Sequence, residues 1–294
     1  MPVSSISSPS VLEGPEREIM ASYLLVTCLY NEEDNVDGLF DSIEEQVLPP
    51  GLWLVIDDGS TDGTYDRIAQ RSRMTPLAIK VWRGDRKAEP DYDTIGLAIR
   101  KALLTLDEET YGGFEYFCLL GADSRVGPDY FSSITDRMES DLELGMASGV
   151  VVTRTGREKT RPDIPRGSGS STRASVWRSI SREDIPDFDI DAFYTAKTRI
   201  MGLKTRMFDD LEVFQTRPTT TLSPYRKGQL MAIHWYNPIV VAAHAVRIVL
   251  GGNSPIPLIM GYAQGLRGKR IQDDDVKRYF GRRIVLDLIR MKLR

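Results

Sequence analysis

Cysteine is scarce in this sequence: the 294 residues include only two, Cys28 and Cys118. Both lie in apolar runs of strand length, and neither has partners at the spacing of metal ligands. We therefore interpret them as small core residues of a protein in a reducing compartment. This argues against a disulfide framework and against a cysteine-based metal site.

A strong excess of one charge is also absent. The formal net charge is −4, which lacks the basic excess of a nucleic-acid-binding protein, so we expect no nucleic-acid partner. The charge is uneven, however. Residues 265–294 contain ten Lys/Arg and four Asp/Glu, so this tail carries +6 and the remainder −10. Such a tail favours contact with an anionic membrane surface.

The first twenty residues lack the apolar core of a secretory signal and are rich in Ser, Pro and Glu. We expect residues 1–20 to form a mobile extension. Without a secretory signal, the expected location is the cytoplasm.

Apolar runs of strand length alternate with segments of helical periodicity. The runs lie at 22–30, 52–57, 77–82, 116–123 and 145–152, and helical spacing occurs at 36–47 and 95–106. This alternation predicts an α/β fold with a mainly parallel sheet. In such sheets, ligands bind beyond the carboxyl ends of the strands.

Acidic residues follow three of these predicted strands. They are Glu32 and Glu33 after Asn31, the pair Asp57 and Asp58, and a lone Asp123 in "LLGADSRVGPDYF". Acidic side chains at one rim suit a metal-bound, sugar-bearing ligand better than a bare phosphate.

The strand–helix alternation ends near residue 152. Residues 153–173 are basic and rich in Gly, Ser and Pro, which predicts a mobile loop. A helix is expected to begin near Asp191. Asp189 and Asp191 are candidate site residues, but acidic residues are also favoured in a first helical turn, so capping is an alternative role.

Residues 230–250 form a long apolar run, but Asn237-Pro238, two His and an Arg interrupt it. A membrane span needs about 20 mostly apolar residues, so we expect a core or interfacial helix instead. Trp235 and Tyr236 are typical of headgroup depth. In the last predicted helix, apolar residues align on one side and recur on the other, which leaves membrane, oligomer and domain contacts open. The aligned residues are Val276, Phe280, Ile284, Leu288 and Met291.

Three stretches together resemble the opening motifs of glycosyltransferase family 2: "TCLYNEEDNVDGLFDSI", "LVIDDGSTDGT" and "LLGADSRVGPDYF". The resemblance covers residues 22–217, and more weakly the tail is similar to that of membrane-associated members. It implies the GT-A fold, an α/β/α sandwich with a mainly parallel central sheet. We place the family domain at 21–227 and a C-terminal helical segment, apolar and basic, at 228–294.

The resemblance also implies site residues. The donor, a nucleotide-diphosphate sugar, would be contacted by Cys28, Tyr30, Glu32 and Asp58, while Asp57 is either a turn residue or part of the site. Asp123 matches the last acid of the family's Asp-X-Asp signature, which binds Mg²⁺ or Mn²⁺, whereas Gly121 replaces the first acid. One carboxylate plus the donor's diphosphate is sufficient in principle to hold such a cation.

The family's general base is an acid before a helix that ends in Gly. Counting back from Gly202, Asp191 falls at the matching position and Asp189 is the runner-up. Candidate cations for the leaving group are Arg166, Arg173 and Arg217. Gln215 stands where relatives often carry His, and Lys197 where they often carry Arg.

The implied function is inverting, metal-assisted transfer of a sugar to a hydroxyl of a lipid-linked or polysaccharide acceptor. A polyprenyl-phosphate sugar synthase and a catalytically silent nucleotide-sugar-binding protein are the alternatives. A dinucleotide-dependent reductase is disfavoured, because no Gly-X-Gly-X-X-Gly follows the first strand. The sugar, the base and the oligomeric state are left open.

Overall fold

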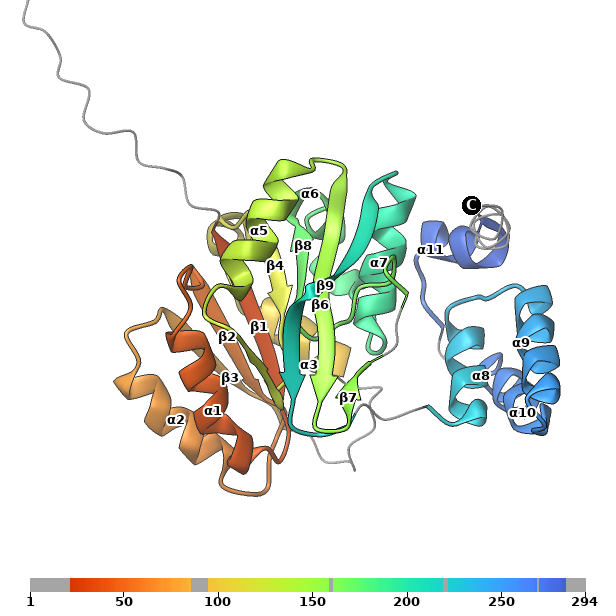
Figure 1. Cartoon of the computed structure of the whole chain (residues 1–294), viewed down its shortest axis with the longest axis horizontal. Coiled ribbons are helices and arrows are strands. Elements are labelled where there is room, and N and C mark those ends of the chain that lie inside the picture. The colour runs from red at the N-terminus through yellow and green to blue at the C-terminus, as the bar shows by residue number, and fades with distance from the viewer. Residues whose placement is uncertain (1–21, 86–94, 159–160, 219–221, 269, 284–294) are drawn as a thin grey trace, which may run out of the picture.

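The computed structural model describes residues 22–85, 95–158, 161–218, 222–268 and 270–283 (Figure 1). The extension predicted at 1–20 lies outside these residues. So do Ile284, Leu288 and Met291 of the predicted last helix.

A nine-stranded sheet forms the centre of the described chain. The order along the sheet is β3-β2-β1-β4-β8-β6-β9-β5, with β7 paired to β6. The strands are β1 (Tyr23–Leu29), β2 (Leu52–Asp57), β3 (Ile79–Arg83), β4 (Tyr116–Leu119), β5 (Ser124–Val126), β6 (Leu144–Thr153), β7 (Gly156–Arg157), β8 (Ser170–Arg173) and β9 (Lys204–Gln215).

The sheet is mainly parallel, as the alternation of strands and helices predicts. β1 pairs in parallel with β2 and β4, β2 with β3, and β6 with β9. β8 is antiparallel to both β4 and β6, and β5 is antiparallel to β9. The carboxyl ends of β1, β2, β4 and β9 therefore share one rim, together with the start of β8.

The prediction that residues 153–173 form a loop is wrong at both ends of the stretch. Gly156–Arg157 pair with β6 as β7, and the last four residues form β8 in the interior of the sheet. Ser170, Ser171 and Thr172 are fully buried there. β8 lies between β4 and β6, and Ser171 Oγ lies 3.1 Å from Cys118 Sγ. These small polar residues are typical of a loop in sequence, but here they form a buried strand.

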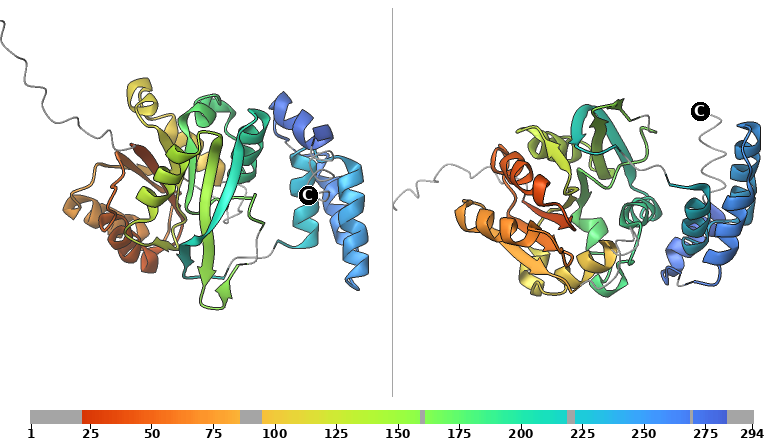
Figure 2. Two further views of the ribbon diagram at one scale, coloured as in Figure 1. Left: turned by 45° about the horizontal axis from the view of Figure 1, so that its top comes forward. Right: turned by 90° about the horizontal axis from the view of Figure 1, so that it is seen from below.

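Helices cover both faces of the sheet, which gives the predicted α/β/α sandwich (Figures 1 and 2). Alternating strand residues divide between the faces: Tyr23 and Leu25 belong to one core cluster, Leu24 and Val26 to the other. The first face packs α1 (Glu33–Glu44), α2 (Thr64–Met74) and α5 (Tyr130–Ser140). The second packs α3 (Ile95–Leu103), α6 (Ala174–Trp177) and α7 (Ile190–Ile200), while α4 (Glu108–Gly112) contributes Tyr111.

The helix predicted near Asp191 is confirmed as α7. Its N-cap residue is Asp189, whose side chain makes no capping hydrogen bond with the helix. The side chain of Asp189 therefore does not have the capping role that we considered for it. This frees its carboxylate for contacts outside the helix.

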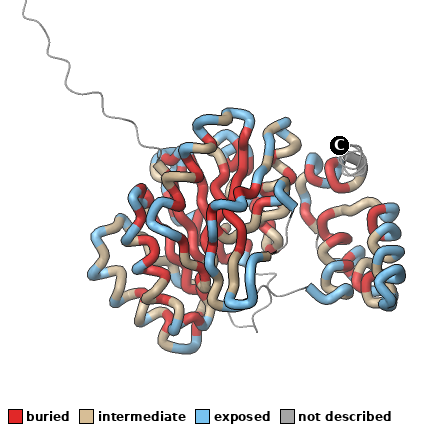
Figure 3. Tube along the Cα trace, in the orientation of Figure 1, coloured by how far each residue is buried: buried red, intermediate tan, exposed pale blue. Residues whose placement is uncertain are grey.

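The C-terminal segment is helical: α8 (Pro224–Ile233), α9 (Pro238–Leu250), α10 (Ile256–Gly265) and α11 (Asp274–Arg278), followed by a π-helical turn (Tyr279–Arg283). The apolar run 230–250 is split between α8 and α9, because Asn237 caps α9 and Pro238 begins it. No helix within the described residues is long and apolar enough to cross a membrane. Figure 3 shows that this segment has buried stretches of its own, apart from those of the sheet.

Part of the C-terminal segment packs on the sheet domain. Its residues Ile233, Ile271, Val276, Tyr279 and Phe280 share a core cluster with α3, α6 and α7. An ion pair of 2.8 Å between Lys197 of α7 and Asp273, the N-cap of α11, adds a polar contact. We expected interfacial or domain packing here, and for these residues the contact is with the domain.

Candidate functional site

The candidate site lies where the strand order reverses. The chain runs outward from β1 to β2 and β3, then returns to place β4 on the other side of β1. Such a switch point opens a crevice beyond the carboxyl ends of the two central strands. Glu32 follows β1, Asp58 follows β2 and Asp123 follows β4, so the three predicted acids lie at the same rim of the sheet.

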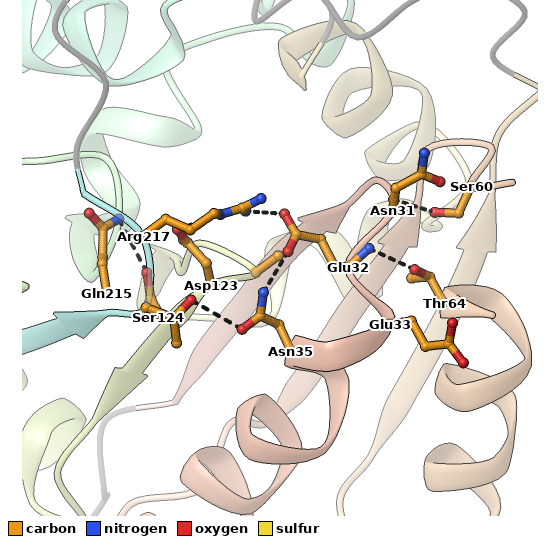
Figure 4. A network of polar contacts seen from close by, with 12 residues as sticks. Asn31, Glu32, Glu33, Asn35, Ser60, Thr64, Asp123, Ser124, Gln215 and Arg217 are labelled. Atoms are coloured by element: carbon orange, nitrogen blue, oxygen red, sulfur yellow. Dashed lines mark hydrogen bonds and ion pairs between the residues drawn. The ribbon is translucent and has the colours of Figure 1, made fainter. Parts of the chain in front are cut away.

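Backbone and side-chain hydrogen bonds hold Glu32 in place (Figure 4). Asn31 adopts a left-handed conformation with φ 53°, which turns the chain sharply from β1 into α1. The backbone N–H of Glu32 then donates to Thr64 Oγ1 at 2.7 Å, and Asn35 Nδ2 donates to Glu32 Oε2 at 2.7 Å. The carboxylate of Glu32 is buried but remains at the rim.

Arg217 joins Glu32 to Asp123 (Figure 4). Its Nη2 donates to Glu32 Oε1, and its Nε lies 3.3 Å from Asp123 Oδ2. The position follows from β9, because Gln215 pairs with Ser124 and the backbone N–H of Thr216 donates to the carbonyl of Asp123 at 2.9 Å. Of the three arginines predicted to contact the leaving group, Arg217 is the one that pairs with the rim acids Glu32 and Asp123.

Asp57 and Asp58 differ in their surroundings. Asp57 is fully buried; its Oδ1 accepts from Ser60 N at 3.2 Å, and its Oδ2 lies 3.3 Å from Arg83 Nε. These contacts fit the turn role that we considered for Asp57. Asp58 lies beside the end of β1, because its N–H donates to the carbonyl of Leu29.

Gly121 leaves room for two serine hydroxyls. A Cβ there would lie 2.9 Å from Ser124 Oγ and 3.1 Å from Ser168 Oγ. Ser168 Oγ accepts from the N–H of Gly121 at 2.9 Å and lies 2.7 Å from Ser124 Oγ. A side chain at 121 would require both hydroxyls to move, so the serine pair occupies the space that a first acid would take.

The loop before β8 also reaches Asp191. A Cβ on Gly167 would lie 3.2 Å from the Cβ of Asp191, so the two residues are in close contact. Since Ser168 binds the turn that carries Asp123, this short loop links the turn to Asp191. The structure thus brings the predicted base to the predicted metal-binding turn, although the two lie far apart in sequence.

Asp191 is half-buried in the first turn of α7, and its Oδ1 accepts from Ala192 N at 3.0 Å. Burial, followed by the charge of Asp189 and a hydrogen bond to it, raises the pKa of Asp191 to about 7. For Asp189, burial opposes ionisation, but the neighbouring His234 and the hydrogen bond from Asp191 outweigh it and lower the pKa. One proton is therefore shared by the pair and resides mainly on Asp191.

The other predicted residues are placed differently. Arg166 is paired with Glu158, and its N–H donates to Ser148 Oγ. Arg173 pairs with Tyr116 at the start of β4, the opposite end from Asp123, and donates to the carbonyls of Leu144 and Met138. This location is structural and does not fit the donor contact predicted for Arg173.

Cys28 and Tyr30 lie at the end of β1 beside β2. Cys28 is the partner of Ile56 in the strand register, and it packs partly buried against the second core face. Tyr30 is half-buried directly before Asn31. Both are thus close in sequence and register to Glu32 and Asp58.

Within the described residues, no group of three or more His, Cys, Asp or Glu side chains is arranged to hold a metal ion. Asp123 offers hard carboxylate oxygens at the rim, which suit Mg²⁺ or Mn²⁺. Its side chain is 17% exposed, so one face is open to a ligand. The donor set fits a cation that takes its remaining ligands from a bound diphosphate and water.

The sequence matches the family model "Glycosyl transferase family 2" over residues 24–191. This is more than half of the chain, so the protein belongs to glycosyltransferase family 2, and the predicted enzyme class, a glycosyltransferase, is confirmed. No curated protein sequence matches the chain significantly.

Solved glycosyltransferase structures share the fold. TarS 1-349 from S. aureus, in complex with UDP-GlcNAc, has a TM-score of 0.54 at 15% identity, covering 72% of this chain and 64% of that one. The mannosyltransferase PcManGT from Pyrobaculum calidifontis, in complex with GDP-Man and Mn²⁺, has a TM-score of 0.53 at 16% identity, covering 83% and 68%. The chain thus spans less than two thirds of the TarS fragment, and the likeness establishes the GT-A fold.

Two residues of the site escaped the sequence analysis, His234 and Ser168. His234 is one of two histidines in the chain, and its Nε2 lies 2.8 Å from Asp189 Oδ2. The scarcity of histidine and the position of His234 inside an apolar run were the available signals. Ser168 was one of several similar residues in a Gly/Ser-rich stretch, and nothing local distinguishes it.

Proposed function

We propose that the protein transfers a sugar, with inversion, from a nucleotide-diphosphate sugar to a hydroxyl of a lipid-linked or polysaccharide acceptor. The observation that carries the proposal is the loop from Gly167 to Ser168. It contacts Asp191 on one side and the turn of Asp123 on the other. These contacts support the proposal, because attack on an anomeric carbon requires the proposed base, Asp191, near the proposed diphosphate site at Asp123.

The donor would lie across the switch point. Asp58, an acceptor-only group when ionised, suits the N–H of a base or the ribose hydroxyls. Cys28, Tyr30 and Glu32 line the end of β1 beside it. Support for a nucleotide-sugar donor comes from the family and from the fold shared with TarS and PcManGT, which are in complex with UDP-GlcNAc and GDP-Man.

Asp123 would hold Mg²⁺ or Mn²⁺ together with the donor's diphosphate. When bound, the cation would offset the charge that develops on the leaving group. Arg217 is the side chain that can add to this effect, since its guanidinium already lies against Asp123. PcManGT, which shares the fold, is in complex with Mn²⁺.

In the transfer step, the acceptor oxygen attacks the anomeric carbon while its proton passes to Asp191. The bond from that carbon to the diphosphate oxygen breaks, and the nucleoside diphosphate leaves with the electron pair. A base works best with a pKa near the working pH. The pKa of about 7 at Asp191, raised by burial and by Asp189, meets this condition.

The acceptor class is suggested by an exposed apolar surface, which we call the α9–α10 surface. It consists of side chains that are at least half exposed: Ile239, Val246, Val249, Leu250, Ile256, Ile259 and Met260. Figure 2 shows α9 on the side of the segment away from the sheet. Single exposed apolar residues are ordinary, but a gathering on two neighbouring helices is typical of a membrane or protein contact.

Charge favours a lipid surface as the occupant. Residues 218–272, which include both helices, contain six Lys/Arg and no Asp/Glu. An apolar helix face with only basic charges nearby suits the boundary of an anionic bilayer, where each cation contributes on the order of 1 kcal/mol. We propose that the protein associates peripherally with the inner face of the cell membrane and takes a lipid-linked acceptor there.

A thermal-shift screen of nucleotide sugars with Mn²⁺, followed by product analysis, tests the proposal. One donor should stabilise the protein more than its free nucleotide, and that donor should be consumed only when a hydroxyl acceptor is supplied. Polyprenyl phosphate as the sole acceptor separates the alternatives, because product formation with it would indicate a lipid-phosphate sugar synthase. Donor binding without turnover in every acceptor assay would indicate a catalytically silent nucleotide-sugar-binding protein.

A further inference from the structure

His234 lies between aromatic rings at the junction of the C-terminal segment and the sheet domain. Its side chain is 2% exposed. The ring centroids of Phe188 and Phe280 lie 6.2 Å and 5.3 Å away, both edge to face. Nε2 is 2.8 Å from Asp189 Oδ2, which places the two in ion-pair range, although neither ring nitrogen makes a hydrogen bond among the described residues. A histidine buried this far is fixed in orientation.

Asp189 is held in an unusual conformation that directs it toward His234. Its φ of 49° and ψ of 47° lie in the left-handed region, which is uncommon for a residue other than Gly. It precedes α7 without capping the helix N–H groups. The usual reason for an Asp at this position is therefore absent, and the contact with His234 takes its place. Backbone strain of this kind persists only where surrounding structure imposes it.

His234, Asp189 and Asp191 form a connected series. The carboxyl of Asp191 shares a hydrogen bond with Asp189, which in turn faces His234. Asp191 also touches Gly167 in the loop that leads to the Asp123 turn. A change at His234 is thus two contacts away from the base and outside the donor-binding rim.

We propose that His234 is a positioning residue that holds Asp189 ionised and oriented, and through Asp189 determines whether Asp191 carries the proton. This inference rests on the proposed function, in which Asp191 accepts the proton of the acceptor hydroxyl. It also gives the C-terminal segment a part in the reaction, because His234 lies beyond residues 24–191 that match the family.

The surrounding charges agree with this role. His234 lowers the pKa of Asp189 against the effect of burial, and the ionised Asp189 in turn adds to the effect of burial in raising the pKa of Asp191. Other titratable groups near the series are Tyr236, Tyr279, Arg199 and the ion pair of Arg100 with Asp187. The pKa of Tyr236 is raised, chiefly by burial and then by Asp189, so Tyr236 stays neutral in the working range.

Two substitutions should move the pH profile of kcat in opposite directions. His234→Phe keeps a ring between Phe188 and Phe280 but removes the ring nitrogen that faces Asp189 and lowers its pKa, so the carboxyl pair holds its proton more tightly. The acidic limb of kcat should move about one pH unit or more upward. Asp189→Asn removes the negative neighbour of Asp191, so the limb should move downward. The KM for the donor should stay nearly constant in both, because the rim is untouched.

His244→Phe is the matched control, since His244 is the other histidine of the chain and lies on α9 beside Lys227. It should leave the pH profile unchanged. If His234→Phe is not folded by circular dichroism, His234→Gln replaces it with the same expected direction. An unmoved limb in the folded His234 variant, or limbs that move the same way in both substitutions, would overturn the inference.

A second measurement requires no sugar transfer. With two histidines, the ring ¹⁵N signals are assigned by comparison with His244→Phe. Asp189→Asn should shift the Nε2 signal of His234 and leave that of His244 in place. An unchanged His234 signal would refute the contact even if the enzyme is active. A shifted signal in a protein without transferase activity would retain the contact and refute the proposed function instead.

Discussion

The Nε atom of Arg217 lies 3.3 Å from Oδ2 of Asp123, and the same guanidinium donates to Glu32. In the absence of a donor, one arginine thus pairs with two of the three rim acids. The arrangement holds the carboxylate of Asp123 in a fixed orientation. A cation bound with the donor would share Asp123 with Arg217, or it would displace the Arg217 guanidinium from Asp123 toward the diphosphate.

Arg217→Gln should have opposite effects on metal binding and on turnover. Without the arginine, Asp123 and Glu32 lose the cation that pairs with both, so Mn²⁺ binding in the absence of nucleotide should strengthen. The gain should be modest, about two- to tenfold, because Arg217 is 58% exposed and solvent screens its charge. Turnover should fall by about 10²-fold, since a cation at the leaving group is lost.

Isothermal titration with Mn²⁺ and a steady-state assay check the two effects. Arg137→Gln is the control. Arg137 pairs with Asp210 on the domain surface, so its substitution removes the same charge away from the site. Weaker Mn²⁺ binding in Arg217→Gln than in the control would mean that the arginine does not compete with the cation.

Asp123→Asn should remove the dependence of nucleotide binding on Mn²⁺ or Mg²⁺. The amide keeps the size of the side chain but loses the charge that a hard divalent cation requires. Binding that does not need the cation should persist through Asp58 and the end of β1. Calorimetry with and without Mn²⁺ measures both parts. Asp129 is an exposed residue of the same stretch, so Asp129→Asn serves as the control and should bind nucleotide like the unaltered protein. Full Mn²⁺ dependence in Asp123→Asn would refute the metal role.

The α9–α10 surface should be required for binding to anionic vesicles. Val249 and Ile259 are 54% and 52% exposed on α9 and α10, so replacing both by Glu should not disturb the core. Each apolar contact with a membrane contributes roughly 1.5–3 kcal/mol, so the double substitution should weaken binding at least tenfold. Sedimentation with vesicles containing anionic lipid provides the measurement.

The matched control replaces Met74 and Leu142 by Glu, because both are over 70% exposed on the sheet domain. This variant should sediment like the unaltered protein. Deleting residues 265–294 tests the separate prediction that the basic tail contributes, with the largest loss at low salt. Undiminished binding of the Val249/Ile259 variant would show that another surface contacts the membrane.

Gly261→Ala should destabilise the C-terminal segment. A Cβ at Gly261 would lie 1.9 Å from the carbonyl oxygen of Tyr225, because α10 and α8 pack backbone to backbone. We expect a loss of about 1–3 kcal/mol in the free energy of unfolding, as overpacking usually causes. Gly112→Ala is the control, since nothing lies within 4 Å of its added Cβ. Urea unfolding of both variants decides, and equal stability would contradict the close contact of α8 with α10.

Much of the fold was predictable because strands of a parallel sheet that is covered on both faces have nearly continuous apolar sequences. The strands β1, β2, β3, β4 and β6 each carry such a run. β8 was not predictable, because its buried Ser and Thr residues do not form an apolar run. β9 contains Asp209 and Asp210 at a shift of register between β6 and β9, where both are exposed, so its pattern does not alternate.

The acids of the site were predictable from their positions after strands, but their partners were not. Glu32, Asp58 and Asp123 each follow an apolar run, and topology alone brings such residues to one rim. The contacts of Arg217 depend on how β9 returns to that rim, and those of His234 on how α8 packs beside the start of α7. Arg173 shows the converse, because its charge and Gly/Ser context suited a phosphate, whereas the reversed direction of β8 carries it to the opposite end of the sheet.

The measurement that tests the account most directly compares Asp191→Asn with the unaltered protein in donor binding and in nucleoside diphosphate release. The amide cannot accept the proton of the acceptor hydroxyl, so release should fall by about 10²–10⁴-fold. The donor Kd should stay nearly constant, because Asp191 lies apart from the rim that binds the nucleotide. In the unaltered protein, kcat should rise with pH through about 7, as the pKa of Asp191 requires. Release at an undiminished rate from Asp191→Asn, with the donor still bound, would contradict the role of Asp191 as the base.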